Sequence, residues 1–498
     1  MIGIGLNWWQ SIIAIFIAQS ISVITAAFNS RCSESYHIGF PIVARSVFGI
    51  YGAFYAVGAR AMLAAIYYSL KIYVGSSFVV NMLQAVFGSS FTNIPNHVPA
   101  SVGFTTQQFL AFFLYWLIHI PLVFLRLNQL KWLFTLKMAV MLPTMIGLFI
   151  FCMVNTKAQL GTGKLSSAAP STNIAWLIFY GINTALGAHS TLVTNQPDYS
   201  RWAAKRWASI WPQLLFYPIS VTVSAVLGIL STAAINNVWG LKLWNQWDLL
   251  TAILVRYPQS SARFAVFLCA LCWAILVIGT NIAANSIPFG ADCALLAPRY
   301  LNQTRGQLLG LLLAWVICPW YIYASAATFT KFLSGYGLFM AGLTGIMVVD
   351  YYFISRGNLF LHHLYDNKRD NPHYRFYSGV NIQAYIAYIC GCALGFPGFL
   401  GSLGVSVPIA AQELGYLGWL LSFSVSALLY IAMCSVWPTQ NQLAVRRLAL
   451  KWEEKAFESD EDYQFAAAPT IMGTDVEGQH GGEYTGIVVM ETVQPKSG

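Results

Sequence analysis

Lys71 is a charged residue in the middle of the apolar run AMLAAIYYSLKIYVGSSFVV. A charge at the centre of a membrane-spanning helix costs on the order of 3 kcal/mol, and such residues are usually functional. Tyr67 lies one turn earlier on the same helix face, next to Tyr68. An ammonium donates three hydrogen bonds, and a tyrosine ring stacks on planar ligands. We therefore predict a binding site here, the alternatives being that Lys71 snorkels to the interface or pairs with an acid.

A second run, NIAWLIFYGINTALGAHSTLV, combines Asn183 and His189 with two glycines, Gly181 and Gly187. Glycines in a membrane span allow a helix to break and to offer backbone groups to a substrate. They also allow neighbouring helices to pack closely, and the sequence leaves both interpretations open. His189 is either a hydrogen-bonded core group or a proton carrier.

A third run, CWAILVIGTNIAANSIPFGADC, is the most polar. Asn281 and Asn285 are four residues apart and share a helix face. An amide both donates and accepts, so this pair suits the edge of a heterocycle; hydrogen bonding between helices is the alternative. Arg60, nearer the end of its span, is expected to snorkel to the interface.

Catalytic signatures are missing from the sequence. It has no GxSxG, no HExxH and no glycine-rich phosphate loop, and we expect no carboxylate pair at membrane depth. Cys269 and Cys272 have CxxC spacing but no second pair, so they are expected to be core residues rather than metal ligands. We predict that the protein is not an enzyme and that it needs no metal or cofactor.

The elements that position these residues are predicted to be membrane-spanning helices. The 498 residues are 57% hydrophobic and 9% charged, with a mean hydropathy of +0.59. Soluble domains carry roughly 25% charged residues, and one core stops growing at about 250–300 residues. The fold class is therefore an all-α polytopic membrane protein, whose partners are the lipid bilayer and a small molecule. The net charge of +9 is assigned to loops rather than to nucleic-acid binding.

Runs of about 18 apolar residues cross a bilayer as helices. We predict eleven spans, near residues 8–28, 49–80, 109–125, 133–154, 174–193, 210–233, 264–288, 308–323, 329–354, 382–400 and 417–436.

The loops between the predicted spans are alternately rich and poor in lysine and arginine. The segment after the last span is also rich in these residues. The positive-inside rule places that segment in the cytosol. Residues 1–437 are predicted to form the transmembrane domain. Residues 438–498 are predicted to form a cytosolic tail, largely disordered, because the sequence becomes acidic and then polar and glycine-rich.

Several stretches resemble the nucleobase:cation symporter-1 family, in its fungal uracil, allantoin and uridine permease branch. They are LNWWQSIIAI, NSRCSESYHIGFPIVARSVFGIYGAF, STLVTNQPDYSRWA, IGTNIAANSIPFGAD and FLSGYGLFMAGLTGIMVVDYY. The resemblance covers roughly Gly5 to Trp437. It implies an inverted-repeat, broken-helix transporter fold of twelve spans, the first of which is expected to be absent from this chain.

The resemblance assigns substrate roles one residue at a time. Tyr67 matches a position that usually holds a stacking tryptophan, and Lys71 matches one that usually holds glutamine. His189 matches a second stacking aromatic. Asn285 matches an asparagine that holds the substrate and is unchanged. These departures favour a more acidic ligand than uracil or allantoin, or a role for Lys71 as a fixed charge in place of a cation.

Thr280 falls where sodium-coupled relatives bind sodium through hydroxyl groups, but the neighbouring position here is Gly279. The resemblance thus implies coupling to protons rather than to sodium, with Thr280, Asn183 and Asn281 as supporting or coupling residues. Gly187 is assigned to the substrate site.

We predict a proton-coupled symporter in the plasma membrane. It would import a nucleobase, a nucleoside or a related nitrogen heterocycle such as uracil, allantoin or uridine. The alternative is a sensor that does not transport, or an inactive, truncated relative of such permeases. The sequence leaves the oligomeric state open.

Overall fold

The regular structure of this protein is helical throughout the part that can be described. A computed structural model describes residues 2–125, 127–161, 173–205 and 207–457. Within these ranges there is no β-strand, only an isolated bridge between Tyr377 and Val380. The predicted all-α class is confirmed.

Nine helices in the described ranges are long and apolar enough to cross a membrane. They are α1 (Trp8–Tyr36), α3 (Ala53–Phe87), α5 (Thr106–Val123), α6 (Leu127–Thr156), α8 (Ile210–Trp239), the continuous run α10–η3–α11 (Ser260–Asn281, Ile282–Ser286, Ile287–Leu296), the run α13–η5 (Ala326–Val349, Asp350–Ile354), α15 (Ile382–Ser402) and α17 (Gly418–Val436).

The two remaining predicted spans are also helical but fall outside this set. The span predicted near residues 174–193 is α7 (Ile174–Ser200), which is long but rich in polar side chains. The span predicted near 308–323 is α12 (Gln303–Val316), followed by the 3-10 turn η4 (Pro319–Ala324). Proline cannot donate a backbone hydrogen bond, and Cys318 before it has a positive φ of 50°, so the α-helix stops here.

Short elements connect the long helices. They are η1 (Ile2–Ile4), α2 (Phe40–Phe48), α4 (Ser89–Thr92), η2 (Ala100–Val102), α9 (Gln246–Arg256), α14 (Leu361–Tyr365), α16 (Ile409–Tyr416) and α18 (Gln440–Arg447). The break between α2 and α3 is fixed by Gly49, whose φ is +89°. A Cβ there would lie 2.6 Å from the Gly379 carbonyl oxygen, so the turn requires glycine.

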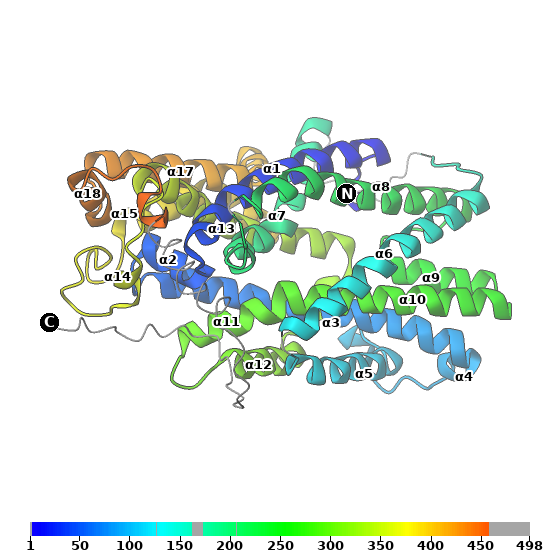
Figure 1. The fold of residues 1–498 in the computed structure, drawn as a ribbon. Coiled ribbons are helices and arrows are strands. Elements are labelled where there is room, and N and C mark those ends of the chain that lie inside the picture. Colours follow the sequence, from blue (N-terminus) through cyan, green and yellow to red (C-terminus); the bar gives the residue numbers. More distant parts are fainter. Residues whose placement is uncertain (1, 126, 162–172, 206, 458–498) are drawn as a thin grey trace, which may run out of the picture.

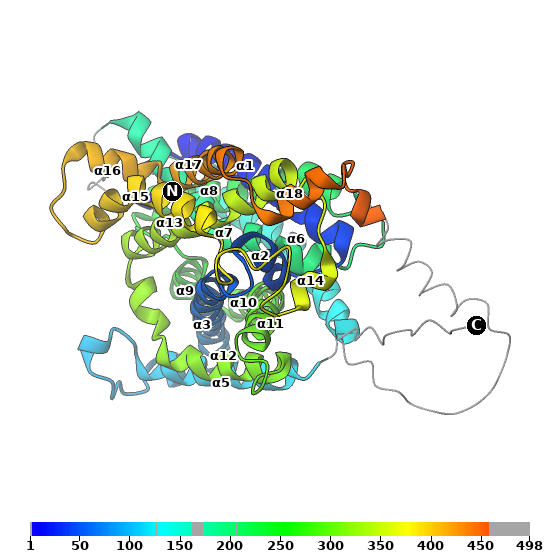
Figure 2. The same ribbon diagram turned by 90° about the vertical axis from the view of Figure 1, so that its left-hand side faces the viewer.

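The helices pack into two groups. In one, α1 packs on α7 and α8, and α13 packs on α7, α15 and α17. In the other, α3 packs on α5, α10, α11 and α12. Helix α6 contacts both α8 and α10 and so connects the groups. In Figure 1 the first group lies above and the second below, with α6 crossing between them; Figure 2 views the bundle from its left-hand end.

Neighbouring residues of helix α3 belong to different hydrophobic cores. Tyr67 packs in a core with Tyr336, Met340 and other residues of α13, α15 and α17, whereas its neighbour Tyr68 packs in a core with Phe112 and residues of α5, α10 and α12. Successive residues of a helix point about 100° apart, so one helix can serve both cores.

The predicted tail begins as packed structure. After α18, Glu453 is buried and accepts hydrogen bonds from Arg31 of α1 (Nε to Oε1, 2.8 Å) and from the Tyr351 hydroxyl (2.8 Å). Residues 438–457 are thereby held against the helical bundle. The rest of the predicted tail, residues 458–498, lies outside the described residues.

Candidate functional site

A cavity of about 560 Å³ lies between the two helix groups. Its wall is formed by side chains of α1, α3, α6, α7, α8, α9, α10 and α13. Two of the predicted site residues, Lys71 and His189, line it. Aromatic side chains form much of the remaining wall: Trp244, Trp247, Trp273, Tyr323 and Phe329. Large, mostly apolar cavities with a few polar groups are typical binding sites for small molecules.

Lys71 enters the cavity from α3. Within the described residues it makes no ion pair and no hydrogen bond through its ammonium, so neither pairing with an acid nor any other contact of the protein satisfies it. The same side chain also lines a second cavity of about 310 Å³. Its three donors are available to a ligand.

His189 comes from α7, on the opposite side of the cavity. Its Nδ1 lies 3.0 Å from the Ala185 carbonyl oxygen and 3.1 Å from Nε2 of Gln19, which lies on α1. Nδ1 donates to the Ala185 carbonyl when it carries the ring proton and accepts from the Gln19 amide when it does not, so each tautomer satisfies one of the two contacts. Gln19 is almost fully buried, lines the cavity, and its Oε1 has no hydrogen-bond partner among the described residues. No sequence pattern points to Gln19, because only the fold brings α1 beside α7.

Tyr67 and Asn285 lie near the cavity but do not line it. The Tyr67 hydroxyl is 2.5 Å from that of Tyr336, whose own hydroxyl donates to the Gly187 carbonyl. Asn285 donates to Asn281 (2.8 Å). These side chains are thus engaged with the protein in this structure, and their predicted contact with substrate stays a prediction.

The Asn281 side chain continues this chain of hydrogen bonds. Its Nδ2 donates to the Tyr68 carbonyl (3.2 Å), which ties α10 to α3. The motif IAANS that follows is the π-helical turn η3. Such turns often mark functional positions because they free backbone groups. Here Asn195 donates to the Ala284 carbonyl (3.1 Å) and Tyr199 to the Ala283 carbonyl (2.7 Å), so η3 is joined to α7.

Gly187 and Asn183 serve the packing of α7. The helix is continuous from Ile174 to Ser200, so of the two interpretations of its glycines the structure supports close packing. A Cβ on Gly187 would lie 2.1 Å from the Leu333 carbonyl oxygen of α13. Asn183 donates to Ser334 (2.7 Å) and accepts from the Trp419 backbone N–H (2.8 Å).

Thr280 lines the smaller cavity together with a lysine that the sequence analysis missed. Lys137 of α6 lies with its Nζ 3.5 Å from the Thr280 hydroxyl oxygen. A Cβ on Gly279 would lie 3.0 Å from Cδ of Lys137, so the glycine leaves room for the lysine. The signal that identified Lys71, a charge inside an apolar run, is also present at Lys137.

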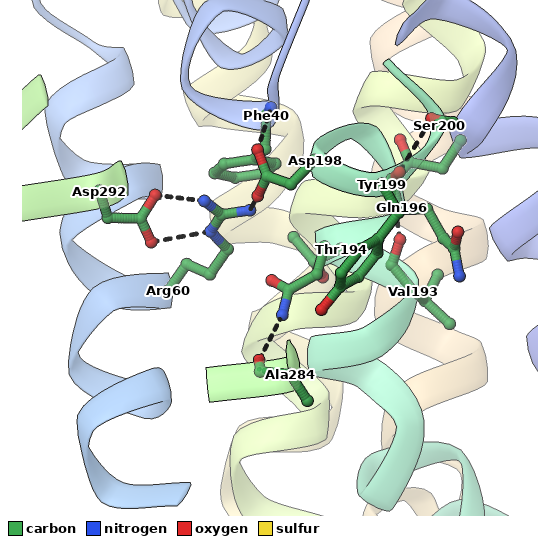
Figure 3. A network of polar contacts seen from close by, with 12 residues as sticks. Phe40, Arg60, Val193, Thr194, Gln196, Asp198, Tyr199, Ser200, Ala284 and Asp292 are labelled. Atoms are coloured by element: carbon green, nitrogen blue, oxygen red, sulfur yellow. Dashed lines mark hydrogen bonds and ion pairs between the residues drawn. The ribbon is translucent and has the colours of Figure 1, made fainter. Parts of the chain in front are cut away.

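Arg60 corrects one expectation. It does not snorkel: it is fully buried and pairs with Asp198 (NH1 to Oδ2, 2.5 Å) and with Asp292 (Nε to Oδ2, 2.9 Å), as Figure 3 shows. Both acids thus share one guanidinium. Buried charges persist only when paired, and Phe40 completes the cluster with its ring 3.9 Å from the guanidinium carbon and its N–H on Asp198 (3.0 Å).

Comparison with known proteins places the chain among permeases. A sequence profile of the family described as "Permease for cytosine/purines, uracil, thiamine, allantoin" matches residues 1–422. The allantoin permease of Saccharomyces cerevisiae is 34% identical over 442 residues, which is 87% of this chain and 69% of that protein. The uridine permease of the same yeast is 32% identical over 489 residues, 97% of this chain and 75% of that protein. The uracil permease of this yeast is 32% identical over 442 residues, which is 87% of this chain and 70% of that protein.

Solved structures show the same fold. The inward-facing form of Mhp1 matches with a TM-score of 0.64 at 19% identity, covering 93% of this chain and 89% of that one. A closed form of Mhp1 with bromovinylhydantoin bound, a nucleobase-cation-symport-1 family transporter, also matches with a TM-score of 0.64 at 20% identity, covering 87% and 88%. The predicted transporter fold is confirmed.

Proposed function

The chain belongs to the family of permeases for cytosine/purines, uracil, thiamine and allantoin and is a membrane transporter, and from this premise we propose that it imports a planar nitrogen heterocycle by proton-coupled symport. The observation that carries the proposal is the aromatic cavity lined by Lys71 and His189. The cavity lies between two helix groups that can rock against each other and so expose it to one side of the membrane at a time.

The proposed binding mode uses the predicted residues. Tyr67 and His189 stack on the two faces of the ring, and Lys71 and Asn285 bind its polar edge. Tyr67 and Asn285 would exchange their present partners, Tyr336 and Asn281, for the ligand.

Proton coupling is supported by the titratable groups at the cavity. His189 changes charge near neutral pH in water, and it contacts Gln19 on a neighbouring helix. Thr280 provides a hydroxyl, but its neighbour Gly279 supplies no oxygen side chain for a sodium ion, and Lys137 lies beside both. We therefore propose protons rather than sodium as the coupling ion.

Orientation follows from charge. The connections and terminal segment that are rich in lysine and arginine face the cytosol under the positive-inside rule, which puts the C-terminus inside the cell. Together with the family, this supports placement in the plasma membrane. A fluorescent fusion at the C-terminus, quenched only after permeabilisation, tests both points.

Uptake measurements test the transporter proposal. The full chain is expressed in a yeast strain that lacks its own uracil, uridine and allantoin permeases, and uptake of the radiolabelled compounds is followed with surface expression. We expect saturable uptake of at least one planar heterocycle that a protonophore abolishes and that replacing sodium by potassium leaves unchanged. Surface-expressed protein with no uptake of any compound would contradict the proposal and favour a non-transporting sensor.

A further inference from the structure

The cavity region holds two ammonium groups. Lys71 lines both the larger and the smaller cavity, so the two adjoin at its side chain, and Lys137 lines the smaller one. The only hydrogen bond of the Lys137 ammonium to a described residue goes to the Thr280 hydroxyl, at 3.5 Å. That hydroxyl donates its own proton to the Leu276 carbonyl (2.8 Å) and brings no charge.

No carboxylate among the described residues balances these charges. The acidic residues between positions 1 and 437 are Glu34, Asp198, Asp248, Asp292, Asp350, Asp366, Asp370 and Glu413. None of the eight lines either cavity. Those deepest in the bundle are already engaged: Asp198 and Asp292 hold Arg60, and Asp350 accepts from the Tyr430 hydroxyl (2.8 Å). An ammonium partly removed from water is stabilised by a counter-charge, which an anionic ligand would supply here.

The other lining groups suit a planar ring. Trp273 lines both cavities, and its Nε1, which is buried, has no partner among the described residues. Gln19 presents an unpartnered Oε1 on the opposite side. An indole N–H and an amide oxygen are the donor and acceptor that a nitrogen heterocycle pairs with, and the tryptophan rings offer faces for stacking.

We propose that this site selects a nitrogen heterocycle that carries a negative charge, with a ring carboxylate held by Lys71 and Lys137. Hydrogen bonds between an ammonium and a carboxylate are roughly twice as strong as neutral ones, and one carboxylate can accept from both partly buried lysines. Uracil, uridine and allantoin, after which the relatives are named, carry no carboxylate. The inference rests on the proposed function and specifies the substrate class of the same site.

A matched ligand pair tests the charge requirement. Uracil and uracil-6-carboxylate differ by one carboxylate, and their binding to the purified full chain in lipid nanodiscs is measured by titration calorimetry. We expect the carboxylate to bind at least about tenfold more tightly, as one charge-assisted hydrogen bond provides. Lys71→Gln and Lys137→Gln should each remove about tenfold of that preference. Lys137→Gln, which makes no proposed contact with uracil itself, should leave uracil binding within about threefold. Lys331→Gln, an exposed lysine on α13, is the control and should change neither affinity.

The outcomes separate the two proposals. Uptake of uracil with no preference for uracil-6-carboxylate would overturn the inference and leave the transporter proposal standing. If neither compound is bound or taken up, the result would count against both the inference and the transporter proposal. A preference that survives in both lysine variants would also overturn it, as would full competition by chloride or inorganic phosphate, which would identify a site for small inorganic anions. Melting temperatures of the variants within a few degrees of the parent exclude misfolding as the cause.

Discussion

Arg60 and Asp198 lie 2.5 Å apart across the interface of α3 and α7, and neither side chain reaches solvent. The pair joins two helices that also carry Lys71 and His189 into the cavity. We therefore expect the position of the cavity walls to depend on an ion pair whose two residues do not themselves line the cavity.

Removing Arg60 should destabilise the protein strongly. Arg60→Ala leaves Asp198 and Asp292 buried without their counter-ion, and breaking a buried pair in this way costs about 3–5 kcal/mol. We expect a lower surface yield and a melting temperature lowered by several degrees, measured by fluorescence-detected size exclusion. Arg299→Ala, at an exposed arginine, is the control. An unchanged melting temperature in Arg60→Ala would contradict a structural role for the pair.

Gly187→Ala should disrupt the packing of α7 on α13. The new Cβ would lie 2.1 Å from the Leu333 carbonyl oxygen, a distance that forces the helices apart. Overpacking of this kind costs about 1–3 kcal/mol, and we expect reduced thermal stability and uptake. Gly58→Ala in α3 adds a Cβ with nothing within 4 Å and should be neutral or slightly stabilising, because alanine is the better helix former. Equal effects of the two substitutions would rule out this packing argument.

Asn285→Ala should abolish uptake while the protein still reaches the cell surface. The substitution removes the proposed contact with the ring edge but only one hydrogen bond of the protein, to Asn281, which contributes about 1 kcal/mol to stability. Uptake is measured against surface-biotinylated protein, with Asn302→Ala at the exposed start of α12 as control. Unchanged transport would remove Asn285 from the substrate site.

The connection between η5 and α15 should loosen in acid. His373 stacks on Phe360 with ring centroids 4.0 Å apart, and burial, assisted by the nearby His363, lowers the pKa of His373 from 6.5 to about 4. The folded state thus prefers the neutral ring, so its stabilising contribution is complete above pH 6.5 and is lost as the pH falls toward 4. Hydrogen exchange of residues 360–377 should be faster at pH 5 than at pH 7.5, after correction for intrinsic rates.

His373→Phe keeps the ring stack without a titratable group and should remove this difference. His362→Gln, at an exposed neighbouring histidine, should retain it. A pH difference that persists in His373→Phe would assign the effect to another group.

Much of the architecture was predictable because local composition fixes it. Apolar runs of sufficient length must be helices in a bilayer, since every backbone N–H and C=O has to be satisfied within the segment. The motifs in α2, η3 and α13 indicated the family. Lys71 was identified as a candidate because it is a charged residue within an apolar run. Two predicted spans are not among the long apolar helices. Helix α7 is rich in polar side chains because it packs against other helices, and α12 is short because it ends before Pro319.

What the sequence alone determined, therefore, was the class, the family and several of the polar residues within the apolar runs. Only the tertiary structure decided their partners. Helical periodicity shows that Tyr67 and Lys71 share a face, but not that the Tyr67 hydroxyl meets Tyr336 while Lys71 lines a cavity. Arg60 was expected at the membrane interface because it lies nearer the end of its span. Its two partners, Asp198 and Asp292, are 138 and 232 positions away in the chain. Partners so distant are set by helix packing, and no local pattern encodes that packing.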